Sequence, residues 1–139
     1  MRTFLDTNVF LYAFLDQDAA KKPVAARLVS NAVRAGNGFI SLQVVNEFCN
    51  VMVKKSGKAL SEILEATKLF GLFPMVDGSL RMTQRALEIR DLYDVQFYDA
   101  LMLASSEAAG CEEILTEDLN DGQMYGSVKA VNPFKKCES

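Results

Sequence analysis

Short apolar segments alternate with longer amphipathic segments along the 139 residues, and this alternation restricts the possible folds more than any other feature. The apolar segments predict strands at residues 2–5, 38–42, 73–77, 112–118 and 127–134. The amphipathic segments predict helices at residues 7–16, 22–36, 41–57, 60–71, 80–94 and 96–110. Strands that alternate with helices favour a three-layer α/β/α sandwich with a central parallel sheet. No linker or repeat interrupts the pattern, which predicts a single domain over residues 1–139.

Turn and cap residues suggest where some of these elements begin. Thr7 or Asn8 is expected to cap the first helix, Ser41 the third helix and Ser61 the fourth. Pro74 has no N–H to donate, so the strand at 73–77 should lie at a sheet edge or begin at this residue.

The composition excludes several classes of protein. Half of the residues are hydrophobic and the net charge is −3, which argues against a generally basic nucleic-acid coat protein. The odd set of cysteines, Cys49, Cys111 and Cys137, contains no CxxC pair and indicates a reducing compartment. No signal peptide or membrane-spanning run is evident. A cytoplasmic protein without membrane contact is expected.

The absence of histidine restricts the chemistry further. A Ser-His-Asp triad, a Cys-His pair and a zinc site with histidine ligands are impossible within this chain. If the protein is an enzyme, proton transfer falls to carboxylates, lysine, tyrosine, cysteine or metal-activated water.

Two aspartates follow apolar strands. Asp6 ends the first strand and Asp118 ends the strand at 112–118. Because ligands of open α/β sheets bind beyond the carboxyl ends of the strands, both side chains are expected at the same edge.

Two further acids lie on helical faces that look buried. Glu47 follows Val44 by three residues and precedes Val51 by four, so it shares their apolar face. Asp99 is followed at helical spacing by Met102 on a helix that is apolar or small over most of its circumference. Such carboxylates need partners, because burying an unpaired charge is costly.

If these four acids converge, a cation between them would relieve their repulsion. Hard oxygen ligands suit Mg²⁺ or Mn²⁺ better than zinc. Such an ion can activate water and stabilise a phosphate during in-line displacement.

Each acid also has a simpler explanation. Asp6 could cap a helix, Asp99 could complement a helix dipole, and Glu47 could turn to solvent. Asp118 and Asp121 could be ordinary turn residues. Basic residues within 21–34, 54–58 and 81–90 could hold RNA phosphates, although solvated helix faces explain most of them.

Four segments carry a family resemblance. They are FLDTNVFLYAF (4–14), SLQVVNEF (41–48), YDALMLAS (98–105) and ILTEDLNDG (114–122). They resemble the four acidic motifs of the PIN-domain family, in the family's order, and the best match is to VapC-type toxins of toxin–antitoxin pairs. The resemblance implies a Rossmann-like sandwich and a Mg²⁺- or Mn²⁺-dependent endoribonuclease.

The same resemblance implies roles for single residues. Asp6 and Asp99 would be the main metal ligands, and Glu47 and Asp118 would complete the acidic, catalytic cluster. The supporting polar positions are Thr7, Asn8, Thr116 and Asp121. Many relatives have an aromatic residue where this chain has Asp121, so either Asp118 or Asp121 is the fourth acid. The implied partners are an RNA substrate, a cognate antitoxin and a second copy in a homodimer.

Three other classes of protein fit the sequence less well. A PIN-like module that binds RNA or a partner without cutting would not need four acids. A response-regulator receiver would need paired acids after its first strand, and a haloacid-dehalogenase phosphatase would need a second aspartate where Asn8 stands.

Overall fold

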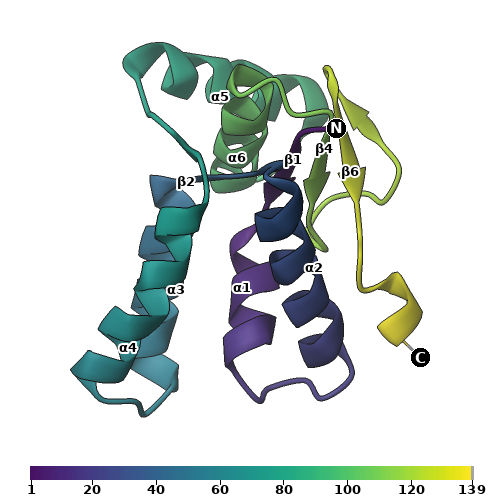
Figure 1. Ribbon diagram of the computed structural model, residues 1–139. Coiled ribbons are helices and arrows are strands. Elements are labelled where there is room, and N and C mark those ends of the chain that lie inside the picture. Colours follow the sequence, from purple (N-terminus) through teal and green to yellow (C-terminus); the bar gives the residue numbers. More distant parts are fainter. Residues whose placement is uncertain (139) are drawn as a thin grey trace.

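Six strands form one sheet in the computed structural model, which describes residues 1–138 (Figure 1). The strands are β1 (Thr3–Leu5), β2 (Gly38–Ser41), β3 (Met75–Val76), β4 (Glu113–Leu115), β5 (Met124–Tyr125) and β6 (Val128–Val131). Their order across the sheet is β3-β2-β1-β4-β6-β5. Every neighbouring pair is parallel except β5 and β6, which are antiparallel.

Six α-helices flank this sheet. They are α1 (Thr7–Phe14), α2 (Lys21–Ala35), α3 (Leu42–Lys55), α4 (Leu60–Thr67), α5 (Leu80–Tyr93) and α6 (Phe97–Ala108). Two 3₁₀ turns, η1 (Lys68–Leu72) and η2 (Lys135–Cys137), add short connections. In Figure 1 the α5–α6 pair lies on the opposite side of the strands from α1–α4. The predicted α/β/α sandwich with a mostly parallel sheet is therefore confirmed.

The sheet order creates a reversal next to β1. The chain moves outward from β1 to β2 and β3, and then returns across them to β4 on the other side of β1. The carboxyl ends of β1 and β4 are adjacent, with Leu5 opposite Leu115 in the parallel register. A topological switch point of this kind is where open α/β sheets form ligand sites.

The edges of the sheet differ in how well the sequence predicted them. Strand β3 lies at an edge and begins after Pro74, as expected from the missing proline N–H. The short strand β5 was not predicted. It pairs with β6 through a tight turn in which Gly126 has φ 61°, a conformation that glycine adopts without strain.

The helix caps correct two of the expectations and confirm the position of the third. Asp6, rather than Thr7 or Asn8, is the N-cap of α1, and its carboxylate accepts from the N–H of Thr7. Ser41 occupies the N-cap position of α3, but its side chain makes no capping bond. Helix α4 starts after Ala59 instead of at Ser61, because Glu62 reaches back to accept from the Ala59 N–H at 3.2 Å.

Aromatic rings occupy the core beneath α1 and α3. Phe10 and Phe48 are fully buried, and each packs edge-to-face against Phe70, with ring centroids 4.9 and 5.0 Å away. Phe14 and Phe73 extend this cluster. The rings connect α1, α3 and η1 into one layer.

No helix among residues 1–138 is both long and apolar enough to cross a membrane. Cys49, Cys111 and Cys137 are all free thiols, so the described chain contains no disulfide.

Candidate active site

Asp6 lies at the switch point, between the end of β1 and the start of α1. Only 4% of its surface is exposed. One carboxylate oxygen accepts from the Thr7 N–H at 2.6 Å, and the other accepts from the Thr116 hydroxyl at 2.8 Å. The carboxylate is therefore both a helix cap and a partner of the residue that follows β4.

The segment after β4 brings a second acid to the same edge. The hydroxyl of Thr116 accepts from the Asp118 N–H at 3.1 Å while it donates to Asp6. The Asn8 amide lies 3.5 Å from a carboxylate oxygen of Asp118, at the limit of a hydrogen bond. Asp118 itself is exposed, so its carboxylate is open to solvent beside Asp6.

Glu47 is directed inward from α3, as its place on an apolar face predicted. It accepts from the Thr7 hydroxyl at 2.9 Å, which connects it to the N-terminus of α1. The Gln43 amide lies one helical turn earlier, 3.5 Å from the same oxygen, and also donates to the Tyr98 carbonyl at 3.1 Å. Sequence reasoning missed Gln43, although its spacing of four residues from Glu47 was a usable signal.

Asp99 lies in the first turn of α6 and is half-buried. Together with Asp118 it lines a cavity of about 290 Å³ between the α5–α6 junction and the segment after β4. The other residues around this cavity are Tyr93, Asp94, Val95, Gln96, Leu119, Asn120 and Tyr125. Asp99 thus approaches the site from the opposite face of the sheet to Glu47.

The pKa values reflect crowding among these carboxylates. Burial, with smaller contributions from the charges of Asp118 and Asp99, raises the pKa of Asp6 to about 7, against the hydrogen bond from Thr116, which lowers it. Burial, followed by the charges of Asp118 and Glu47, raises the pKa of Asp99 to about 6. The pKa of Asp118 is also raised, first by the partial loss of solvent around its carboxylate and then by the charge of Glu117. These acids are close enough to repel one another.

Asp121 lies away from this cluster. Its carboxylate accepts from the Asn132 N–H at 2.8 Å and pairs with Lys135 at 3.3 Å. These contacts lower the pKa of Asp121, with the Asn132 bond contributing most. Of the two candidates for the fourth acid, Asp118 is the one beside Asp6.

The donor chemistry of the site suits a hard divalent cation. Carboxylate oxygens are the preferred ligands of Mg²⁺, and a cation would relieve the repulsion that raises the pKa of Asp6 and Asp99. Within residues 1–138, no three acidic or cysteine side chains are grouped closely enough to enclose an ion. Mg²⁺ commonly uses only one or two carboxylates and keeps several waters, so the residues present fit such an ion.

The metal-free protein is expected to lose stability as the pH rises from about 4 to about 7. The unfolded chain releases the Asp6 proton near the ordinary pKa of 3.8, whereas the folded chain holds it to about 7. In this interval the folded state binds more protons, so the free energy of unfolding falls with increasing pH. The urea midpoint measured in chelator should be lower at about pH 8 than at about pH 5, and Mg²⁺ should reduce the difference. Equal midpoints would contradict the raised pKa.

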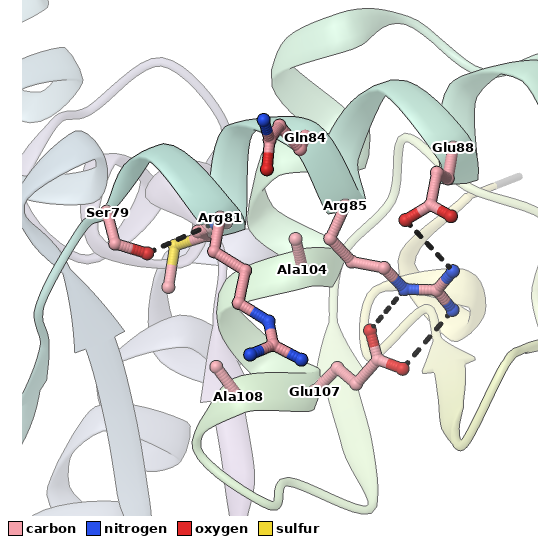
Figure 2. A pocket seen from close by; sticks show the side chains of 9 residues that line it. Ser79, Arg81, Gln84, Arg85, Glu88, Ala104, Glu107 and Ala108 are labelled. Atoms are coloured by element: carbon pink, nitrogen blue, oxygen red, sulfur yellow. Dashed lines mark hydrogen bonds and ion pairs between the residues drawn. The ribbon is translucent and has the colours of Figure 1, made fainter.

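A larger cavity lies at the other end of the α5–α6 pair and has a different character (Figure 2). It measures about 530 Å³ and contains Arg81 and Arg85. Glu107 pairs with Arg85 at 2.8 Å, and the Arg81 guanidinium lies beside this pair. Arg81 and Arg85 both line this cavity, and none of the candidate acids does.

The chain belongs to the PIN domain family, whose sequence model matches residues 3–122. This match confirms the family indicated by the four acidic segments and covers all of them. No sequence of a curated protein matches the chain significantly.

Three solved structures with the same fold are similar to this chain. A toxin–antitoxin complex from Klebsiella pneumoniae contains a chain with a TM-score of 0.70 and 20% identity, covering 94% of this chain and 97% of that one. VapC20 of Mycobacterium tuberculosis, described as a sarcin–ricin loop cleaving toxin, has a TM-score of 0.66 and 19% identity, covering 81% and 86%. VapBC2 from Rickettsia felis, bound to a DNA fragment from its promoter, has a TM-score of 0.66 and 16% identity, covering 95% and 100%.

Proposed function

We propose that this protein is a divalent-metal-dependent endoribonuclease and the toxin of a toxin–antitoxin pair. The observation that carries the proposal is the approach of Asp6, Glu47, Asp99 and Asp118 to one edge of the sheet from four separate segments. Family membership and the likeness to VapC20, described as an RNA-loop cleaving toxin, support the same activity.

Two carboxylates are assigned to the ion, Mg²⁺ or Mn²⁺. Asp6 and Asp99 would hold it, with Asp118 or Glu47 completing the set. When bound, the ion supplies positive charge that acidifies water and stabilises the scissile phosphate. Glu47 or Asp118 would be the general base for the attacking water, since carboxylates can take up such a proton.

Polar neighbours keep these carboxylates in position. Thr116 donates to Asp6 and thereby turns the second oxygen of that carboxylate toward β4. Thr7 holds Glu47 at 2.9 Å, and Asn8 lies beside Asp118. Hydrogen bonds to a ligand from outside the metal shell orient it and raise its affinity for the ion.

Protein partners form part of the proposal. The complexes from Klebsiella pneumoniae and Rickettsia felis support a cognate antitoxin for this chain. Large apolar side chains are exposed on the outer helices, among them Leu60 and Leu64 on α4 and Leu80 and Leu87 on α5. Exposed apolar side chains of this kind are suited to an antitoxin or to a second copy in a homodimer.

The Asp99→Asn variant is expected to lose metal-dependent RNA cleavage while keeping its fold. Asparagine has nearly the same shape, but it cannot supply the negative charge that the ion requires. Cleavage of mixed RNAs should be measured with Mg²⁺, with Mn²⁺ and with chelator, and circular dichroism should report folding. Wild-type cleavage that disappears in chelator and in Asp99→Asn would establish the activity.

Asp91→Asn is the matched control, because Asp91 is exposed on α5 outside the proposed site. It should cleave as the wild type does. Equal cleavage by wild type and Asp99→Asn would overturn the assignment of the site. RNA binding without cleavage under any metal condition would favour the alternative, a PIN-like module that binds RNA without cutting it.

A further inference from the structure

Lys21, Tyr12 and Glu117 form a small network beside the acidic cluster. The Lys21 ammonium donates to one carboxylate oxygen of Glu117 at 2.8 Å. The Tyr12 hydroxyl donates to the other oxygen and lies 3.4 Å from the ammonium. Both oxygens of Glu117 therefore have a donor, one from α1 and one from the first residue of α2, two helices that lie side by side (Figure 1).

This ion pair is more buried than the others in residues 1–138. The Lys21 and Glu117 side chains are 13% and 15% exposed, whereas the neighbouring pair of Lys22 and Asp16 is 39% and 91% exposed. The Lys21 ammonium also lies 4.9 Å from the ring centroid of Tyr12 and 5.7 Å from that of the fully buried Phe134. A charge in such surroundings is strongly held, because breaking a buried pair leaves its partner uncompensated.

Glu117 lies between two residues of the proposed active site. Thr116 donates its hydroxyl to Asp6, and the Asp118 N–H donates to that same hydroxyl. Thr116 and Asp118 thus contact the acidic cluster, while the side chain between them contacts Tyr12 and Lys21. The segment 116–118 is therefore held by the Asp6 contact of Thr116 and by the Tyr12 and Lys21 contacts of Glu117.

We propose that Lys21 is a positioning residue, which holds Glu117 and thereby places Thr116 and Asp118 in the acidic cluster. Its role in metal binding and cleavage rests on the proposed function. Its role in ordering the segment 116–118 does not, since that follows from the contacts of Glu117 alone. Lys21 lies in one of the basic segments that could hold RNA phosphates, but its proposed role is to hold Glu117 inside the protein.

The test replaces Lys21 by methionine, which keeps the apolar stem and removes the charge. Lys21→Met is expected to speed hydrogen exchange of the Asp118 amide by about tenfold or more, with Ile114 in β4 unchanged. Mn²⁺ affinity measured by calorimetry should fall by about tenfold, as for other residues that orient a metal ligand. Cleavage should fall through kcat, with KM for RNA near the wild-type value.

Lys22→Met is the matched control, because it removes the adjacent lysine and only an exposed ion pair. It should match the wild type in every measurement. Lys21→Arg should restore part of the exchange protection, since it returns a cation to Glu117. If Lys21→Met does not fold, Lys21→Met/Glu117→Gln removes the uncompensated charge and should show the same faster exchange at Asp118.

The outcomes separate this inference from the proposed function. Wild-type exchange at Asp118 in Lys21→Met, or in the double variant if only that one folds, would overturn the positioning role. Faster exchange spread equally over Ile114 and the rest of the sheet would also overturn it. A wild type that neither binds Mn²⁺ nor cleaves RNA would refute the proposed function, and the exchange comparison would still decide whether Lys21 positions the segment.

Discussion

Asp6→Asn is expected to abolish RNA cleavage and, in metal-free buffer, to raise the melting temperature. Asparagine keeps an oxygen that accepts from the Thr7 N–H, so the cap of α1 survives. It removes a buried carboxylate whose pKa of about 7 shows that the folded protein resists its charge. Residues that only hydrogen-bond to a metal ligand typically cost up to about a hundredfold in activity when they are replaced. Because Asp6 is proposed as a ligand itself, the loss of cleavage should exceed about a hundredfold.

Cleavage and the melting temperature at about pH 8 should be measured on the same preparations. Asp77→Asn, at an exposed aspartate in the loop after β3, is the matched control and should change neither quantity. Full cleavage by Asp6→Asn would remove Asp6 from the metal site. If Asp6→Asn melts at a lower temperature than the wild type in chelator, the Asp6 carboxylate stabilises the folded chain without an ion. That result would contradict the raised pKa of Asp6.

Phe48→Ala is expected to lower the free energy of unfolding by about 3–5 kcal/mol. Phe48 is fully buried in α3, and its ring lies between those of Phe14 and Phe70, with centroids 5.4 and 5.0 Å away. Truncation would leave a cavity where α1, α3 and η1 meet, and the surrounding backbone can close it only in part. Urea unfolding would measure the loss, which is a large share of the stability of an ordinary domain.

Tyr98→Ala is the control for this prediction, because Tyr98 is an exposed aromatic residue with 58% of its surface accessible. It should change the free energy of unfolding by no more than about 0.5 kcal/mol. Phe48→Leu should fall between the two variants, since it retains most of the apolar contact. A loss below about 1 kcal/mol for Phe48→Ala would show that the aromatic cluster contributes little to the packing of α1, α3 and η1.

Most of the fold could be predicted from local patterns. The helices at α2, α3, α5 and α6 were expected near their observed bounds, since apolar residues recur there at helical spacing. The short hairpin strand β5 could not be predicted, because two residues carry no periodic signal. Its pairing with β6 depends on long-range contacts. The expectation of a single domain over residues 1–139 stays a prediction.

Part of the candidate site could also be predicted from local patterns, and part could not. Asp6, Glu47 and Asp99 attracted attention because each carboxylate interrupts an apolar pattern, and burial of a charge is costly enough to need an explanation. The choice between Asp118 and Asp121 could not be made from the sequence. It depends on which side chain turns toward Asp6 after β4 and which turns toward Asn132 and Lys135.

The sequence by itself determined the fold class, because spacing along each segment decides which face a side chain occupies. It also indicated the family through four acidic segments, and it singled out Asp6, Glu47 and Asp99 as candidate site residues. Only the tertiary structure decided that Lys21 leaves solvent to hold Glu117, 96 residues away, and that Gln43 reaches the backbone of α6. Such contacts arise when the helices pack on the sheet. Their energy depends on burial and on the distance between charges, and neither quantity is encoded in local spacing.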